Sequence, residues 1–363
     1  MAVWNVYVGT FTSEFPWLTG PAGKGIDRFS FDDATGSLRY LETTIGVLSP
    51  QYLAKHHRLP VLYAAEFAVP GRLTTFAIGP NGSLQRASST PSLGEMAVAV
   101  SIHPSARRAY VANWGSGTLA ALALDPDGMV TRADPIAQLK RRESRDKSQP
   151  ASHPHHIRPS PSGDSVLVAY AGLDELTAYR ADAAGALSDL PIVRIEFPPE
   201  SAPRHIEFHP AGQFVYVVGE RDSRLYVLES EDGLPTRIRD SYATPPAGYS
   251  DRNNPSEIKL HMNGRTLYVG NRGSDCVTIF RLDPSGGFIE AADRQPSLGR
   301  GPRAISIDPT GQYLLVGNAD SGDLAVFQIN DKGGLRSVGP PVQSPSPSSI
   351  AFAASTVTLI KSP

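Results

Sequence analysis

The side chains best suited to bind and transform a small molecule stand at the ends of predicted strands. Residues 203–220, P-R-H-I-E-F-H-P-A-G-Q-F-V-Y-V-V-G-E, are predicted to form a β-hairpin with a tight turn at its glycine. Arg204 and Glu220 are equidistant from that glycine, so an unbulged hairpin would place them opposite each other. Arg272 and Arg303 follow the same pattern further along the chain. Arginines that converge in this way favour binding of a carboxylate or a phosphate.

A second cluster, His153-Pro154-His155-His156, has three interpretations. Histidine is a common metal ligand, but no cysteine partner and no H-E-x-x-H spacing supports a metal site. We favour a catalytic role for His155 and a substrate-binding role for His153, and packing within a loop is the third interpretation. His205, Glu257 and Asn271 complete the candidate substrate-binding residues.

These residues also have structural interpretations. Arg204 and Arg303 could form ion pairs with Glu220 or Glu257, and asparagines such as Asn271 often cap strand ends. The single cysteine, Cys276, lies in an apolar strand pattern and is expected to be buried. The sequence contains no G-x-S-x-G on a strand-to-helix turn, no Gly-rich phosphate loop and no dinucleotide fingerprint that opens a helix.

The composition restricts the class of protein. The 363 residues include 33 glycines and 32 prolines, which suits many short strands and turns. A formal net charge of −2 argues against nucleic acid as the main partner. Residues 1–8 are typical of a strand and not of a signal peptide, and no stretch approaches the ~20 apolar residues of a membrane span. We expect a cytoplasmic protein without membrane contact or cofactor, either a monomer or a weak homo-oligomer.

An internal repeat of about 50 residues explains where the polar residues fall. An apolar strand with a short motif at its end recurs seven times, ending at Thr10, Glu66, Asn113, Tyr170, Glu220, Asn271 and Asn318. Six copies follow another strand, and each copy precedes a third strand and a weaker fourth strand. Four antiparallel strands in each repeat predict an all-β fold, the seven-bladed β-propeller.

The first copy lacks a preceding strand, because the chain starts too late to provide one. Residues 348–352 supply the missing strand, and the ring is expected to close by pairing them with residues 3–8. Closure in this way leaves no open sheet edge. We expect residues 1–363 to form a single propeller domain.

Propeller geometry predicts a common location for the candidate residues. The first and second strands of a blade are antiparallel, so the start of the first and the end of the second lie on one face. The polar strand ends therefore converge at one mouth of the central channel. Three long connections, residues 12–24, 138–152 and 241–256, leave from the same face. A concave site with convergent titratable groups is the default active-site hypothesis.

The order of several short motifs resembles that of a known family. The motifs are Y-V-G-T at 7–10 with G-I at 25–26, H-P-H at 153–155, P-R-H at 203–205 with Glu220, E-I at 257–258, N-R-G at 271–273, and P-R at 302–303 with D-P-T-G at 308–311. Over essentially the whole chain they are similar to the seven-bladed β-propeller lactonases. That family includes the propeller-type 6-phosphogluconolactonases and the fungal carboxy-cis,cis-muconate cyclase.

The resemblance implies a metal-independent site built from His155, Arg204, Glu220 and Arg272, with Glu257 and Arg303 nearby. It also implies hydrolysis of a sugar-acid lactone, or the reverse ring closure, with the small lactone or sugar acid as the partner. His155 or Glu220 would be the general base. Arg204 would stabilise the oxyanion or hold Glu220 ionised, and Arg272 and Arg303 would hold the substrate's carboxylate or phosphate.

Three other functions remain alternatives. One is a cycloisomerase of the carboxymuconate type. Another is a non-enzymatic binding module, which would present more exposed aromatic residues and fewer buried charges. The third is a calcium-dependent hydrolase with an oxygen cage formed by Glu66, Asn113, Glu220 and Asn271.

Overall fold

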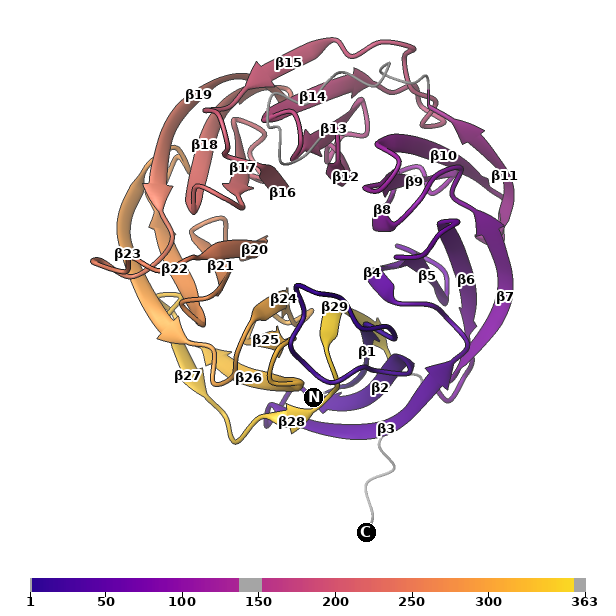
Figure 1. Cartoon of the computed structure of the whole chain (residues 1–363), viewed down its shortest axis with the longest axis horizontal. Helices are drawn as coiled ribbons and strands as arrows, with labels where there is room; N and C mark the ends of the chain where they lie inside the picture. The colour runs from indigo at the N-terminus through magenta and orange to yellow at the C-terminus, as the bar shows by residue number, and fades with distance from the viewer. Residues whose placement is uncertain (1, 137–151, 356–363) are drawn as a thin grey trace.

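The computed structural model describes residues 2–136 and 152–355 of the chain. In this part, seven antiparallel sheets stand around a common axis (Figure 1). The described residues contain no helix, and therefore none that could cross a membrane. The predicted all-β, seven-bladed propeller is confirmed.

In each blade the strands are named in order from the innermost, next to the axis, to the outermost. Blades 1 to 3 are β29 (Pro347–Ala354), β1 (Val3–Thr10), β2 (Gly25–Asp32), β3 (Ser37–Ile45); β4 (Pro50–Lys55), β5 (Val61–Glu66), β6 (Arg72–Ile78), β7 (Leu84–Pro91); and β8 (Ala97–Ile102), β9 (Arg108–Asn113), β10 (Thr118–Leu124), β11 (Val130–Pro135). Blades 4 and 5 are β12 (Pro154–Pro159), β13 (Ser165–Tyr170), β14 (Glu175–Arg180), β15 (Val193–Glu196); and β16 (Pro203–Phe208), β17 (Phe214–Gly219), β18 (Arg224–Glu231), β19 (Leu234–Ala243). Blades 6 and 7 are β20 (Asn254–Leu260), β21 (Thr266–Arg272), β22 (Cys276–Leu282), β23 (Ile289–Pro296); and β24 (Pro302–Ile307), β25 (Tyr313–Asn318), β26 (Asp323–Ile329), β27 (Leu335–Ser337), with β28 (Val342–Gln343) also paired to β26.

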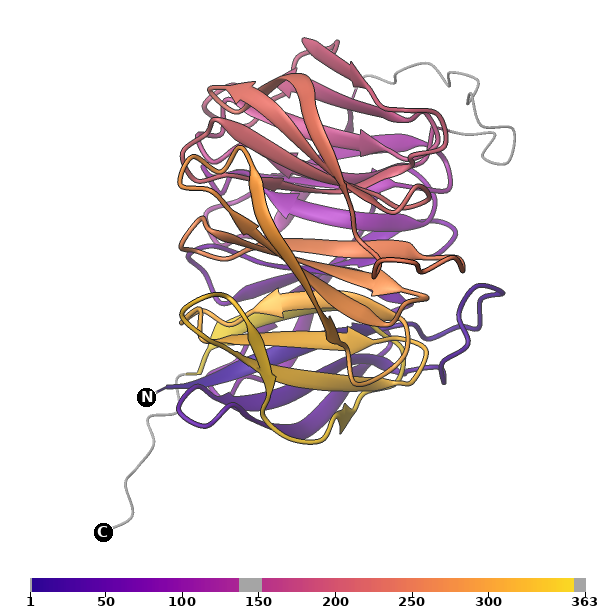
Figure 2. The same cartoon turned by 90° about the vertical axis from the view of Figure 1, so that its left-hand side faces the viewer.

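The ring closes as the sequence predicts. Strand β29 pairs antiparallel with β1, with Val6 opposite Phe352, and becomes the inner strand of blade 1. Two of the three long connections, β1 to β2 and β19 to β20, project from the same face of the ring (Figure 2). The third, residues 138–152, lies almost entirely outside the described residues.

The hydrophobic core lies between neighbouring blades. Second strands such as β5 and β17 are buried along their whole length, whereas outer strands such as β3 are largely exposed. One apolar cluster joins β5 of blade 2 to β9 of blade 3, and comparable clusters fill the other interfaces. The side chains of the inner strands nearest the axis are consequently the ones left for chemistry.

A tyrosine in the second strand locks one blade to the next. The hydroxyl groups of Tyr7, Tyr63, Tyr110, Tyr216 and Tyr268 each donate a hydrogen bond to a turn-glycine carbonyl of the following blade, at 2.6 to 2.9 Å. Each accepting glycine has a positive φ, which a residue with a Cβ rarely adopts. These tyrosines also align the blades, and they place Gly219, not Glu220, level with Glu66 and Asn271.

All seven inner strands carry a β-bulge near their start, after the first paired residue in six blades and after the second, Pro255, in blade 6. In blade 5, Pro203 lies opposite Gly219 and His205 lies opposite Val218, so Arg204 is the extra residue. The predicted hairpin at residues 203–220 is confirmed, but it is bulged, so Arg204 is not directly opposite Glu220. A bulge re-aims the extra side chain and strengthens the local twist, and bulges are common next to active sites.

Candidate active site

Two sets of equivalent residues surround the axis at one face of the propeller. The first set, the bulge ring, holds the extra residue of each inner strand. Its members from blade 1 to blade 7 are Ser348, Gln51, Val98, His155, Arg204, Ser256 and Arg303. Six of the seven directly follow a proline, which is the first or second residue of the inner strand and has no backbone N–H to donate to the ladder.

The second set, the rim positions, holds the residue that follows the pairing partner of the inner-strand residue directly before the bulge. Its members from blade 1 to blade 7 are Phe11, Phe67, Trp114, Ala171, Glu220, Arg272 and Ala319. Glu220 is thus equivalent to Arg272, and our alignment of Glu220 with Asn271 was shifted by one residue. Because side chains alternate along a strand, that shift changes the side to which a residue points.

The residues one step before the rim positions are used by the fold. Glu66 accepts hydrogen bonds from Thr74 and from the amide of Leu48, and Asn113 bonds to the backbone and hydroxyl of Ser92. Asn271 donates to Thr278 at 3.0 Å and is fully buried. The four residues of the predicted calcium cage therefore have separate local partners, and the geometry assigns Asn271 a structural task.

A cavity of about 480 Å³ opens at this face. Residues of the bulge ring, the rim positions and the long connections line it. They are Trp17, Gln51, Phe67, Val98, Trp114, His155, Ala171, Glu220, Arg221, Arg252, Asn254, Arg272, Gly273, Arg303 and Asp320. Four arginines against two carboxylates make its lining positive, which suits an anionic ligand.

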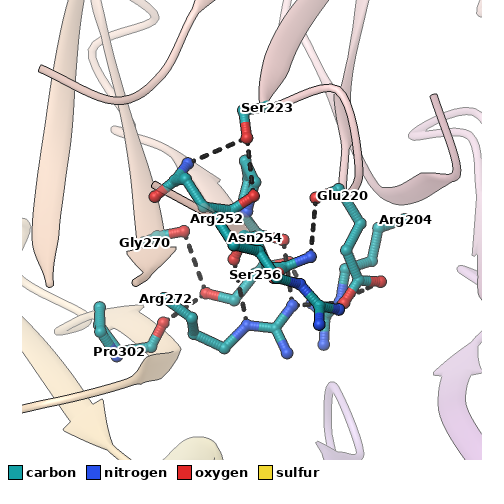
Figure 3. Close-up of polar contacts among 11 residues, drawn as sticks. Arg204, Glu220, Ser223, Arg252, Asn254, Ser256, Gly270, Arg272 and Pro302 are labelled. Carbon is teal, nitrogen blue, oxygen red and sulfur yellow. Dashed lines mark hydrogen bonds and ion pairs between the residues drawn. The ribbon is translucent and has the colours of Figure 1, made fainter. Parts of the chain in front are cut away.

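Glu220 is the centre of the charged part of the cavity (Figure 3). Its carboxylate accepts a hydrogen bond from Arg272 and lies 3.4 Å from Nε of Arg204. Burial alone would raise the pKa of this carboxyl, but the charges of Arg272 and Arg204 outweigh burial and hold the pKa well below its usual range. Glu220 is therefore ionised, and its basicity is low.

Arg204 lies behind Glu220 and does not line the cavity. Its side chain is 2% exposed, and Nη1 donates to the carbonyl of Ser256. Burial lowers its pKa to about 10, so the guanidinium is still charged near neutral pH. Of the two roles predicted for Arg204, this placement fits the one that holds Glu220 ionised.

His155 contributes a neutral imidazole to the cavity. It is 6% exposed, and burial, followed by the charge of Arg204, holds its pKa well below 6.5. Nδ1 has no hydrogen-bond partner in the part of the chain that the structure describes. A neutral, unpartnered imidazole nitrogen can accept a proton.

Arg303 rests on aromatic rings. Its guanidinium carbon lies 5.0 Å from the ring centroid of Phe11 and 4.6 Å from that of Trp17. Burial and the charges of Arg272 and Arg204 lower the pKa of Arg303, because they disfavour a third positive charge here. A bound anion would relieve this repulsion.

The bulge ring concentrates polar atoms whose hydrogen-bonding capacity is unused. Within residues 2–136 and 152–355, buried atoms without a hydrogen-bond partner include Oε1 of Gln51, Nδ1 of His155 and Nε of Arg303, all of which belong to residues that line the cavity. An unsatisfied buried polar atom costs about 1–3 kcal/mol, so their occurrence in one ring indicates a site prepared for a ligand.

Besides Asn271, three predicted substrate-binding residues do not line this cavity. Nδ1 of His153 lies 2.7 Å from the carbonyl of Trp114, and the two rings stack with centroids 4.0 Å apart. His205 stacks on His156, with centroids 4.5 Å apart, and its Nδ1 lies 4.0 Å from the carboxylate of Glu257. Glu257 also pairs with Lys259 at 2.8 Å. His205 and Glu257 thus belong to a buried polar layer deeper along the axis.

Some cavity residues were missed by sequence reasoning. Gln51 follows Pro50 as His155 follows Pro154 and Arg303 follows Pro302, and this recurrent proline would have identified it. Trp17 and Arg252 belong to long connections that we expected at the mouth, but no spacing distinguished them from their neighbours. Asp320, which accepts a hydrogen bond from the amide of Thr19, is placed only by the folded connection.

No group of three or more His, Cys, Asp or Glu side chains with metal-binding geometry occurs among the described residues. Cys276 is buried, as expected, and burial raises the pKa of its thiol.

Comparison with known proteins places the sequence among propellers. Residues 5–352 match the family model described as "Lactonase, 7-bladed beta-propeller". An uncharacterized protein of Lactococcus lactis is 27% identical over 288 residues, which cover 78% of this chain and 82% of that protein. An uncharacterized protein of Staphylococcus aureus is 28% identical over 312 residues, with 82% and 84% covered.

Solved structures show the same fold. The periplasmic gluconolactonase of Pseudomonas aeruginosa superimposes with a TM-score of 0.87 at 26% identity, covering 97% of this chain and 99% of that one. A putative 6-phosphogluconolactonase of Bacteroides fragilis gives a TM-score of 0.86 at 24% identity, with 97% and 98% covered.

Proposed function

The chain belongs to the family of seven-bladed β-propeller lactonases, and from this premise we propose that it hydrolyses an anionic lactone in the cavity at the mouth. The lactones of sugar acids are the first substrates to test, because a structural neighbour is a gluconolactonase. The observation that carries the proposal is the set of unpartnered polar atoms in the bulge ring, on His155 and Arg303 above all.

His155 is the general base of the proposed mechanism. Its Nδ1 takes a proton from water while the water oxygen bonds to the carbonyl carbon of the lactone. Glu220 cannot easily take that proton, because Arg272 and Arg204 stabilise its ionised form. The negative charge of Glu220 instead stabilises the imidazolium that forms, since it favours a proton on His155.

The arginines carry the negative charges of the reaction. Nε of Arg303 donates to the carbonyl oxygen as it becomes an oxyanion, and Arg272 with Arg252 binds the carboxylate or phosphate of the substrate. The bond between the carbonyl carbon and the ring oxygen then breaks. The imidazolium of His155 returns its proton to the ring oxygen, which leaves a hydroxy acid whose carboxyl proton dissociates into solvent.

The test is lactone hydrolysis followed by pH-stat, with the spontaneous rate subtracted. The panel contains two anionic lactones, glucono-δ-lactone 6-phosphate and a γ-butyrolactone that carries a carboxylate, and the uncharged glucono-δ-lactone for comparison. We expect His155→Ala to lower kcat/KM by about 10²–10⁴-fold, the usual contribution of a general base. Glu220→Gln is expected to reduce it to a similar degree.

His57→Ala is the control, because His57 is an exposed histidine on the far side of the propeller that lines a different cavity. Its activity should equal that of the wild type. The proposal fails if no lactone is opened faster than in buffer, or if both site variants retain the wild-type rate.

A further inference from the structure

Five aromatic residues beside the cavity form a continuous cluster, the aromatic wall: Phe11, Phe15, Trp17, Phe67 and Trp114. Phe15 stacks on Trp17 with centroids 5.1 Å apart, and Phe67 contacts Trp17 at 6.3 Å and Trp114 at 6.5 Å. The rings come from the connections that follow the second strands of blades 1, 2 and 3. Three neighbouring blades therefore contribute one apolar surface.

The aromatic wall is open to the cavity. Trp17, Phe67 and Trp114 line the cavity, and Trp17 is 46% exposed. The opposite side is charged, since the equivalent rim positions supply Glu220 in blade 5 and Arg272 in blade 6. A ligand in this cavity therefore meets charges on one side and rings on the other.

Contact with the guanidinium of Arg303 explains the presence of only two rings of the aromatic wall. The guanidinium of Arg303 lies over Phe11 and Trp17. Phe67 and Trp114 extend the wall through two further blades, beyond the reach of that contact. Both rings are only partly buried and line the cavity, and contact with a ligand explains the part of their surface that stays open.

The apolar surface continues outward from the cavity. Val69, two residues after Phe67, is 62% exposed, and Leu48 and Leu93 are 56% and 42% exposed. The amide of Leu48 donates to Glu66 at the base of the same connection, and the amide of Gly71 donates to the carbonyl of Gly94, next to Leu93. These side chains thus border the aromatic wall on blades 1 to 3.

This surface determines which lactones fit. A polyhydroxylated ring pressed against Phe67 and Trp114 would lose water from hydroxyl groups that the rings cannot replace as hydrogen-bond acceptors, which is costly. An alkyl or aryl substituent would gain from burial and from ring contact.

We propose that the preferred substrate is an amphipathic lactone, with its carboxylate or phosphate at Arg272 and Arg252 and an alkyl or aryl arm along Trp17, Phe67 and Trp114. This inference rests on the proposed lactonase function and narrows its substrate class.

The experiment compares γ-butyrolactones that carry one carboxylate and, at the γ carbon, hydrogen, hexyl or phenyl, with glucono-δ-lactone as the polyhydroxylated reference. We expect kcat/KM to rise at least about tenfold from hydrogen to hexyl or phenyl, as hydrophobic pockets discriminate by about 10–200-fold for each methylene. In Trp114→Ala and Phe67→Ala that gain, taken as the ratio of kcat/KM for the substituted and unsubstituted lactones within each variant, should fall to about threefold or less.

Phe288→Ala is the matched control. Phe288 is 49% exposed and lies 3.9 Å below the guanidinium of Arg239, so it resembles Trp17 in exposure and in its arginine contact. It belongs to the connection between β22 and β23, on the opposite face. Its loss should leave the gain unchanged.

A binding measurement separates this inference from the lactonase proposal. Tetrahydrofuran carboxylates with the same γ substituents cannot be hydrolysed, and calorimetry gives their Kd. Tighter binding of the hexyl compound that depends on Trp114 would support the amphipathic ligand even if no lactone is hydrolysed. Hydrolysis of glucono-δ-lactone with no gain from hexyl or phenyl, or equal binding of all three ethers, would overturn the inference while leaving the lactonase proposal intact.

Discussion

Blades 2 and 5 have the same backbone at the mouth and opposite chemistry. Each begins with a proline, a bulged residue and a paired second strand. Blade 2 places Gln51 in the bulge ring and Phe67 at the rim position, whereas blade 5 places Arg204 and Glu220 there. Two side chains for each blade therefore decide whether that sector of the mouth is apolar or charged.

The difference between the two sectors is also energetic. The aromatic rings of blades 1 to 3 pack against one another with their centroids 5.1 to 6.5 Å apart, and such contacts stabilise the fold. The charged sector buries ions and leaves donors unpartnered, which opposes folding. Residues kept at such a cost are the ones expected to bind ligand and to titrate.

The largest expected effect is loss of stability in acid. Burial, with smaller contributions from neighbouring cations, holds the pKa values of His155, His156 and His205 well below 6.5. Below pH 6.5 these histidines bind protons in the unfolded chain but not in the folded chain. Their contribution to the free energy of unfolding is therefore fully present above pH 6.5 and is lost as the pH falls below it. Three histidines give a slope of up to about 4 kcal/mol for each pH unit, at about 1.4 each. Urea unfolding between pH 7.5 and 5 measures it.

Variants assign this slope to the buried histidines. His205→Phe keeps a ring against His156 and should lower the slope by about a third. Phe67→Leu, in the aromatic wall, should leave the slope unchanged. An equal reduction in both variants would mean that the slope does not come from the buried histidines.

The next effect is loss of the charge at Glu220. Glu220→Gln leaves Arg204, which is 2% exposed, without its carboxylate, and removal of one member of a buried pair costs about 3–5 kcal/mol. Glu42→Gln is the control, since Glu42 is 44% exposed in its pair with Arg28 and should cost about 1 kcal/mol or less. Chemical denaturation gives both values. Similar losses of stability in the two variants would show that the buried ion pair of Glu220 is no more costly to break than an exposed ion pair.

Arg303 joins the two sectors, and its replacement by lysine tests whether geometry matters beyond charge. Lysine keeps the positive charge but loses the planar contact with Phe11 and Trp17 and the fixed direction of Nε. If Arg303 binds the lactone oxygen, Arg303→Lys should lower kcat/KM by about tenfold or more. Its unfolding midpoint should remain close to that of the wild type. Unchanged kinetics would show that charge alone suffices.

The sequence predicts the number and order of the blades better than the geometry of the candidate site. Strand alternation and the repeat identify seven blades and the closing role of residues 348–352, because periodicity is repeated seven times and errors average out. The register of one strand pair has no such redundancy. A bulge at Arg204 and a one-residue shift at Glu220 are set by local twist and by the tyrosine hydrogen bonds.

The candidate site is predictable where a signal recurs and not where it depends on one connection. Proline before His155, Arg204 and Arg303 marks three members of the bulge ring. The aromatic wall is assembled from three connections that are far apart in sequence, so no local pattern reveals it. Asn271 and Glu257 carry suitable chemistry, but the fold uses Asn271 at a strand end and Glu257 in a deeper layer.

The smallest expected effect comes from the tyrosine hydrogen bonds between blades, which should stabilise the two sectors equally. Tyr110 in blade 3 and Tyr216 in blade 5 donate equivalent hydrogen bonds of 2.6 Å to Gly185 and Gly286. Tyr110→Phe and Tyr216→Phe each leave one buried carbonyl without its partner, and each should cost about 1–2 kcal/mol of stability. Because both bonds lie in the frame and not at the mouth, kcat/KM should be unchanged in both variants. A loss of activity in Tyr216→Phe alone would mean that the charged sector depends on the hydrogen bond from Tyr216 to Gly286. The active-site geometry of blade 5 would then depend on the contact between blades.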